Sequence, residues 1–306
     1  MRRIIHITAT VAALIAAQHS YAQLTDVKQL GGGYAHLLSV VAQPEISVSG
    51  VDIDSGEDYV TDNDLNALHI PYYQEFDIAG KDTRWYLQAS AGYAVYSLEG
   101  EVALFPDLPS EIESEWTSYN GLLEAGLVFP FSNGFSLSGG ASVGWARLEN
   151  ETSFSEPLYE EVILPIANGK LFNWETDAAL YRAHGALRYD ENHGPYRVKG
   201  VAHLTYSYID SFSESDEFAG FADDSGAAIF LLDVSRNIHH LESGRPVYLI
   251  GHLGSTHFLG ENRDELGFNH YFEAGMSLGI DRYAAGVLVL VGEDANGLSL
   301  VFNYNY

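Results

Sequence analysis

The sequence predicts an all-β fold, a transmembrane antiparallel up-and-down β-barrel of about twelve strands. Three observations lead to it. Twelve candidate strand segments follow one another at near-regular spacing, and several of them alternate apolar and polar residues. The last segment ends in an aromatic residue, and acidic residues concentrate in every second connection. After the N-terminal leader, no apolar run approaches the roughly 20 residues that a spanning helix needs, whereas a spanning strand needs only about 10.

The N-terminus has the features of a secretory signal peptide. Two arginines precede an apolar run, and a small-x-small cleavage site ends at Ala22. We therefore expect residues 1–22 to be a signal peptide, 23–43 a periplasmic or lumenal segment, and 44–306 the barrel. Because the chain contains no cysteine, this exported protein must be held together without disulfides. A closed barrel achieves that through its continuous ladder of backbone hydrogen bonds.

The predicted strands are evenly spaced, and their even number lets both ends of the barrel chain face the periplasm. Several show a clear alternation; in the fifth, Leu137, Val143 and Trp145 share one face and serines and glycines occupy the other. Ala227–Val234 is uniformly apolar and also fits a helix. The twelve predicted strands are Glu45–Ile53, Leu65–Phe76, Arg84–Leu98, Trp116–Phe129, Phe135–Leu148, Trp174–Tyr189, Tyr196–Ile209, Ala227–Val234, Val247–Phe258, Tyr271–Ile280, Tyr283–Val291 and Leu298–Tyr306.

The connections alternate in length, and the long ones carry most of the acidic residues. The short connections are nearly balanced in charge, and Ser235–Pro246 is an exception because it is long on the short side. A soluble β-sandwich shares the alternation and the composition but has no reason to sort its charge in this way, so the sorting favours a membrane barrel. The formal net charge of −27 argues against a nucleic-acid partner. The main long connections are Asp54–Asp64, Glu99–Glu115, Glu149–Phe172, Asp210–Gly226 and Leu259–His270.

The last strand presents one apolar face that ends in an aromatic residue. It resembles the C-terminal signal strand of bacterial outer-membrane barrels, which implies insertion into that membrane and recognition by the barrel-assembly machinery. The residues of this predicted insertion signal are Leu298, Leu300, Phe302, Tyr304 and Tyr306.

Together with the signal peptide and the strand count, this terminal strand makes the chain resemble the Gram-negative family of solitary outer-membrane autotransporter-like β-barrel domains. The resemblance implies a non-catalytic membrane module. No passenger-length region separates Gln23 from the first strand, so we expect a translocator-like domain without a passenger.

Charged and polar side chains on inward parity are the candidate functional residues. They either form a structural ion network inside the barrel or line a porin-like passive channel. In the channel interpretation Arg182, Arg188, Arg197 and Lys199 form a basic wall on two adjacent strands that favours anions. The predicted lumenal charge network is Glu124, Arg182, His184, Arg188, Arg197, Lys199, His203, His252 and Glu273.

A lipid hydrolase at the membrane rim is a further alternative, suggested by His252, Ser255 and His257. On a strand, Ser255 and His257 share a face while His252 points the other way, and no flanking lipase motif is present, so we do not expect an enzyme.

No cofactor or metal motif is present either, and we expect neither group. The expected partners are outer-membrane lipids and lipopolysaccharide, with divalent cations at the acidic loops.

Overall fold

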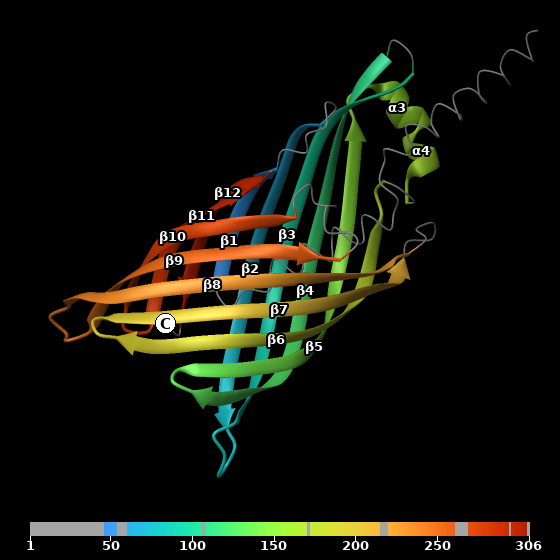
Figure 1. The fold of residues 1–306 in the computed structure, drawn as a ribbon. Helices are drawn as coiled ribbons and strands as arrows, with labels where there is room; N and C mark the ends of the chain where they lie inside the picture. The colour runs from blue at the N-terminus through green and yellow to red at the C-terminus, as the bar shows by residue number, and fades with distance from the viewer. Residues whose placement is uncertain are drawn as a thin grey trace, which may run out of the picture.

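The computed structural model describes residues 46–53, 60–105, 108–169, 172–214, 220–260, 269–293 and 295–304. In them, twelve antiparallel strands form a closed barrel in sequence order, and the first strand pairs with the last (Figure 1). The predicted fold and strand number are confirmed, whereas the expected signal peptide and the 23–43 segment lie outside the described residues. The elements are β1 (Ile46–Ile53), β2 (Val60–Asp77), β3 (Arg84–Phe105), β4 (Leu108–Ser132), β5 (Phe135–Phe154), α3 (Pro157–Val162), α4 (Leu164–Ala167), β6 (Glu175–His193), β7 (Tyr196–Glu214), β8 (Ala222–His240), β9 (Pro246–Leu259), β10 (His270–Ile280), β11 (Tyr283–Gly292) and β12 (Ala295–Asn303).

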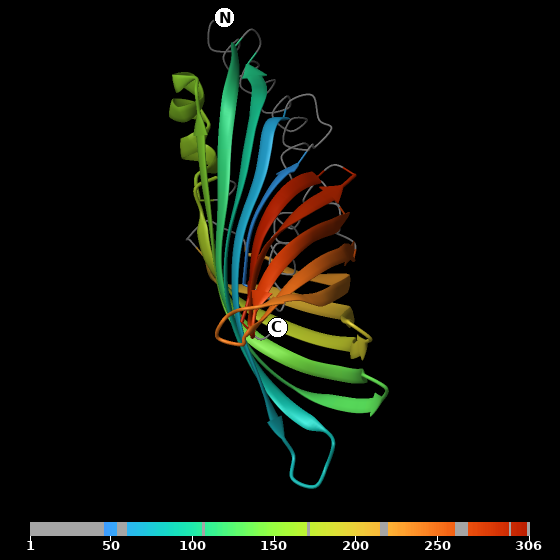
Figure 2. The same cartoon turned by 90° about the vertical axis from the view of Figure 1, so that its left-hand side faces the viewer.

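Several predicted loops are strands, and the largest correction concerns Glu99–Glu115. There β3 and β4 stay paired, Glu99 opposite Glu113 and Glu101 opposite Glu111, and the two strands project well beyond the barrel wall (Figures 1 and 2). The alternation continues into this projection, with acidic side chains exposed on one face and serines buried on the other. Acidic residues alone therefore do not mark a loop, because a strand above the membrane has water on its outer face.

Other connections are also shorter than predicted, beginning with Asp54–Asp64, because β2 starts at Val60. The predicted loop Glu149–Phe172 contains the end of β5 together with α3 and α4, and Asp210–Gly226 contains the end of β7 and the start of β8. The long exception Ser235–Pro246 is mostly strand, since β8 continues to His240 and leaves a five-residue turn. β8 is thus a strand and not a helix, and its apolar residues alternate between the lumen and the lipid face.

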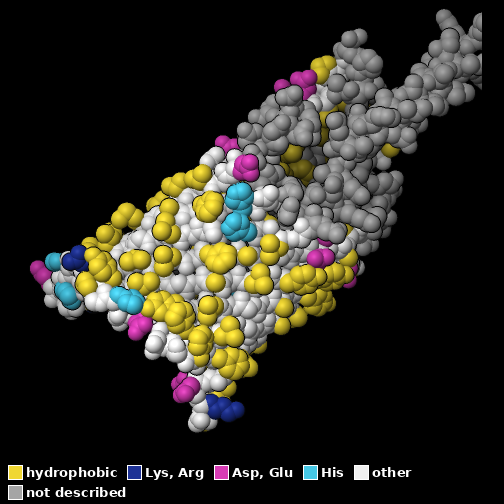
Figure 3. All heavy atoms as spheres, viewed as in Figure 1, with side chains coloured by type: hydrophobic (Ala, Val, Ile, Leu, Met, Phe, Trp, Pro, Cys, Tyr) yellow, Lys and Arg dark blue, Asp and Glu magenta, His cyan; other side chains and the backbone are white. Residues whose placement is uncertain are grey.

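Two rings of outward aromatic side chains bound the lipid-facing wall. Near one end of β3, Trp85 stacks on Phe76 with 4.2 Å between the ring centroids. Further along the strand, Tyr93 contacts Tyr119 with 5.1 Å between the ring centroids. Trp85 and Tyr93 lie eight residues apart, about 26 Å along the strand, or about 20 Å of height at a typical 40° tilt. That height is close to the apolar band of an outer-membrane barrel. Figure 3 shows hydrophobic side chains spread over this wall and charged ones gathered near its ends.

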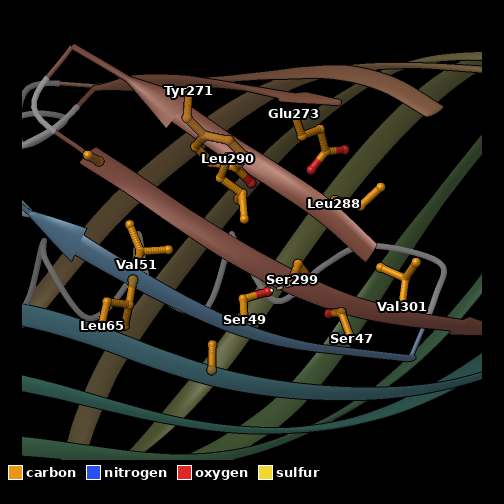
Figure 4. A pocket seen from close by; sticks show the side chains of 12 residues that line it. Ser47, Ser49, Val51, Leu65, Tyr271, Glu273, Leu288, Leu290, Ser299 and Val301 are labelled. Atoms are coloured by element: carbon orange, nitrogen blue, oxygen red, sulfur yellow. Dashed lines mark hydrogen bonds between the residues drawn. The ribbon is translucent and has the colours of Figure 1, made fainter. Parts of the chain in front are cut away.

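The barrel closes where β12 pairs with β1, from Ile46 opposite Phe302 to Ile53 opposite Ala295. On the lumenal side of this seam Ser49 donates a hydrogen bond to Ser299, with 2.9 Å between the hydroxyl oxygens (Figure 4). The small side chains leave a cavity of about 30 Å³ beside this bond. The seam is therefore joined by side chains as well as by the backbone ladder.

The C-terminal residues follow the predicted strand only in part. Leu298, Leu300 and Phe302 point outward and are 52%, 55% and 39% exposed. β12 ends at Asn303, however, so the prediction of a strand to the terminus is wrong at its end. Tyr304 bends away, and its hydroxyl accepts a hydrogen bond of 3.0 Å from the backbone N–H of Tyr73 on β2. Tyr306 lies outside the described residues.

A small apolar core stabilises the projecting strands. Tyr159 of α3 is fully buried against Phe154 and Phe172, and its hydroxyl donates a 2.8 Å hydrogen bond to the Leu108 carbonyl. No described helix is both long enough and apolar enough to cross a membrane.

Candidate functional site

The barrel lumen contains a polar cavity of about 310 Å³ toward the end where the chain terminates. Eight of the nine residues of the predicted lumenal network line this cavity, contributed by β4, β6, β7, β9 and β10. The ninth, Arg197, forms a bidentate pair with Asp190 at the rim, with both N–O distances 2.7 Å. Parity placed these eight side chains inward, and the inward side chains of a narrow barrel share one lumen.

The centre of the cavity wall is a three-residue cluster that joins β3, β4 and β6. The hydroxyl of Tyr86, which is fully buried, donates a hydrogen bond of 2.9 Å to Glu124 Oε1. The Tyr86 hydroxyl oxygen also lies 3.0 Å from His184 Nε2, and His184 Nδ1 lies 3.3 Å from Glu124 Oε2. His203 of β7 packs edge-on against His184 at 4.8 Å between ring centroids. Each charged member therefore has a partner, as burial requires.

Tyr86 reaches across the barrel wall because two glycines make room for its ring. A Cβ atom at Gly126 on β4 would overlap the ring itself, and one at Gly140 on β5 would overlap the hydroxyl. The ring thus lies over two neighbouring strands and brings its hydroxyl to β6. The sequence did not reveal this role for Tyr86, since alternation places a side chain inward without naming its partner.

A second cluster crosses the lumen near the rim. Arg188 of β6 donates a hydrogen bond of 3.1 Å to the hydroxyl of Tyr73 on β2, and it lies 3.7 Å from Glu75 of the same strand. Three strands separate β2 from β6 in the barrel wall, so this contact spans the interior and not the backbone ladder. Arg84 of β3 pairs with Glu75 at 2.5 Å and extends the cluster along the rim.

A third cluster joins β8, β9 and β10. His252 Nδ1 lies 2.7 Å from Asp233 Oδ1, and His252 Nε2 lies 2.7 Å from the hydroxyl oxygen of Ser277. Neither Asp233 nor Ser277 was among the predicted site residues. Asp233 lies near the end of the apolar segment that also fitted a helix. Residues two apart on a strand share a face, so Asp233 faces the lumen together with Leu231, and no other signal of this is present in the sequence.

The residues considered for a rim lipase are not brought together. His252 lines the lumenal cavity, whereas Ser255 pairs in register with Phe230 and Phe272, whose side chains are exposed on the outer wall. His257 stacks on His270 with 5.7 Å between ring centroids. Among the described residues, no group of three or more histidines and carboxylates is placed to hold a metal ion.

The comparisons with known proteins agree with this architecture. A family model described as the solitary outer membrane autotransporter beta-barrel domain matches residues 46–306. No curated protein matches the sequence.

Among solved structures, the translocator domain of the autotransporter NalP from Neisseria meningitidis superposes with a TM-score of 0.54 at 11% identity, covering 95% of this chain and 98% of that one. The transport unit of the autotransporter AIDA-I from Escherichia coli gives a TM-score of 0.51 at 9% identity, covering 91% and 99%. These likenesses concern the fold. The chain therefore belongs to the family of solitary outer-membrane autotransporter β-barrel domains, and its place is the bacterial outer membrane.

Proposed function

We propose that this chain is a translocator-like membrane module without a passenger, whose lumen is held closed by its own side chains and whose main role is not catalytic. The observation that carries the proposal is the contact of Arg188 with Tyr73 and Glu75, which joins strands that are not neighbours in the wall. An ion or solute on its way through the barrel would have to break this contact.

The Tyr86 cluster supports the same conclusion at a second level of the barrel. It joins β3 to β6 through hydrogen bonds of 2.9 Å and 3.0 Å, in a site where the phenol is fully buried. The Arg188 contact across the lumen, the Tyr86 cluster along the wall and a cavity of only about 310 Å³ favour a reinforced barrel over a water-filled pore.

Single-channel recording in a planar bilayer tests this proposal. We expect the wild-type barrel to show no ion conductance. The variant Arg188→Ala should produce brief channel openings, because one of the two clusters is lost. Arg197→Ala is the matched control, since it removes an arginine whose partner Asp190 lies beside it at the rim. A steady wild-type conductance with the same amplitude in Arg188→Ala would show that the contact closes nothing.

A porin-like passive channel is the second candidate function. It is favoured by Arg182, Arg188 and Lys199, which line one cavity and give it a basic wall. If the barrel conducts, this wall predicts a preference for anions, which the reversal potential in a salt gradient would measure.

The surface supports the proposed partners. Lipids contact the band between the aromatic rings, and the outward faces of Leu298, Leu300 and Phe302 offer the barrel-assembly machinery an apolar edge. Divalent cations bridge the acidic outer strands to lipopolysaccharide phosphates, because directly opposed carboxylates such as Glu101 and Glu111 repel each other without counterions.

A further inference from the structure

Asp233, His252 and Ser277 form a hydrogen-bonded row across three adjacent strands. The two links are 2.7 Å each, from Asp233 Oδ1 to His252 Nδ1 and from His252 Nε2 to the Ser277 hydroxyl. We propose that Ser277 is an activated nucleophile that accepts the acyl group of a small carboxylic ester inside the barrel. This activity adds to the membrane role, and it uses the lumenal Ser277 of β10 and not Ser255, which faces outward on β9.

The order of the three groups fixes the direction of the hydrogen bonds. A carboxylate can only accept, so the contact with Asp233 requires that the proton of a neutral His252 ring be on Nδ1. Nε2 is then left as an acceptor, and the Ser277 hydroxyl donates to it. A serine is made nucleophilic by this arrangement, in which the base is held in one tautomer by a third group.

The surroundings of the row also fit a reaction site. Gly275 and Gly279 are the neighbours of Ser277 on the same face of β10, and a Cβ atom at Gly286 on β11 would collide with the Ser277 hydroxyl. These three positions add no side chain of their own beside the hydroxyl, while Leu288 of β11 lies over Gly275 and Ile250 of β9 lies beside Gly279. Its row partners His252 and Asp233 line the cavity of about 310 Å³.

The cavity suggests the class of substrate. Its volume is at the lower end of small-molecule sites, and it is too small for a diacyl lipid. Ile229, Leu231 and Leu288 give it an apolar wall for a short acyl chain, while Arg182 and Lys199 give the same cavity positive charge that attracts a developing oxyanion. A short-chain ester fits both features.

The reaction forms and breaks bonds in two steps. The Ser277 oxygen attacks the ester carbonyl carbon while its proton passes to His252 Nε2. The tetrahedral intermediate then collapses, the carbon–oxygen bond to the alcohol breaks, and the alcohol leaves with the proton from His252. A water molecule repeats the sequence on the acyl-serine and releases the carboxylic acid, which restores Ser277.

A small serine-reactive reagent, phenylmethylsulfonyl fluoride, tests the proposal on the folded barrel in detergent micelles. The Ser277 oxygen displaces fluoride from sulfur and its proton goes to His252, so peptide mass spectrometry should find the adduct on Ser277. Ser299 is an internal control because it is as buried as Ser277, at 3% exposure each, and its hydroxyl contacts another serine and no histidine. Modification of both serines to the same extent, or of neither, would overturn the proposal.

Variants separate an activated serine from one that only cross-links strands. We expect His252→Phe to slow the modification by on the order of 100-fold, the lower part of the range for a positioned base. Asp233→Asn should slow it as well, because an amide N–H facing Nδ1 stabilises the wrong tautomer. Asp233→Asn keeps the volume and the contact, so it tests the same point if His252→Phe does not fold, as judged by heat-dependent mobility on a gel.

Turnover provides the second readout. Hydrolysis of p-nitrophenyl acetate by the purified barrel should be lost in Ser277→Ala and kept in Ser255→Ala, which removes a hydroxyl from the outer face of β9. Adduct rates that are equal in wild type, His252→Phe and Asp233→Asn would refute the proposed role of the row.

Discussion

Replacing Tyr86 with phenylalanine removes one oxygen atom and with it both hydrogen bonds that the phenol makes on the lumenal side of the wall. The ring keeps its place over Gly126 and Gly140, so packing is unchanged. The lost bonds are the 2.9 Å bond to the Glu124 carboxylate and the 3.0 Å contact with His184 Nε2. A bond to a charged group contributes about 1.5 to 3 kcal/mol and a neutral one about 1 kcal/mol.

The expected total is a loss of about 3 kcal/mol in the free energy of unfolding. The loss is somewhat smaller than the sum of the two bonds, because Glu124 keeps its contact with His184 at 3.3 Å. Water does not replace the lost bonds, because the Tyr86 site is fully buried. Guanidinium unfolding in lipid vesicles, followed by the fluorescence of the four tryptophans, measures this quantity. The midpoint should fall while the slope stays the same.

Tyr181→Phe is the matched control, because Tyr181 is 51% exposed on the outer wall. It should change the unfolding free energy by no more than about 0.5 kcal/mol. If Tyr86→Phe also stays within that limit, the reasoning that the lumenal cluster stabilises the barrel is refuted.

Three further predictions concern other parts of the molecule. Gly140→Ala should lower the free energy of unfolding by about 1 to 3 kcal/mol, because the new Cβ would meet the Tyr86 hydroxyl as well as the backbone oxygen of Ala125. In the same unfolding assay, the double variant with Tyr86→Phe should lose less than the sum of the two single losses, and strict additivity would contradict the contact with the hydroxyl. Mg²⁺ should raise the thermal unfolding midpoint more than NaCl of equal ionic strength does, because Glu99 faces Glu113 directly. Glu113→Gln should reduce this difference between the two salts, and an unchanged difference would show that this pair does not bind the cation. Phe302→Ser should lower the yield of folded barrel on insertion into membranes, measured by gel mobility, whereas Phe302→Leu should keep the wild-type yield. Equal yields for the two variants would show that the apolar outer face is not the insertion signal.

Alternation in the sequence was a reliable guide within the membrane and a poor one above it. The predicted strand Phe135–Leu148 and the observed β5 begin at the same residue, because lipid and lumen impose opposite requirements on successive side chains. Beyond the outer aromatic ring both faces can be polar, so Glu111, Glu113 and Glu115 looked like a loop although they are paired strand. At the other end of the chain the same limit applies to Tyr304, whose hydrogen bond to β2 depends on a distant strand.

The candidate site was predictable as a set of positions and not as a set of contacts. Parity identified Glu124, His184 and Arg188 as lumenal, yet it could not indicate that Tyr86 joins the first two or that Tyr73 meets the third. Those partners come from strands whose separation along the chain is long, and only closure of the barrel brings them within reach.

The sequence by itself determined the class of fold, the number of strands and the face on which most side chains lie. It could do so because these depend on local periodicity and on the preference of each residue for lipid or water. The tertiary structure alone decided which inward side chains touch, including the row of Asp233, His252 and Ser277. Such contacts depend on strand register and on the curvature of the closed sheet, which are properties of the whole barrel and of no single segment.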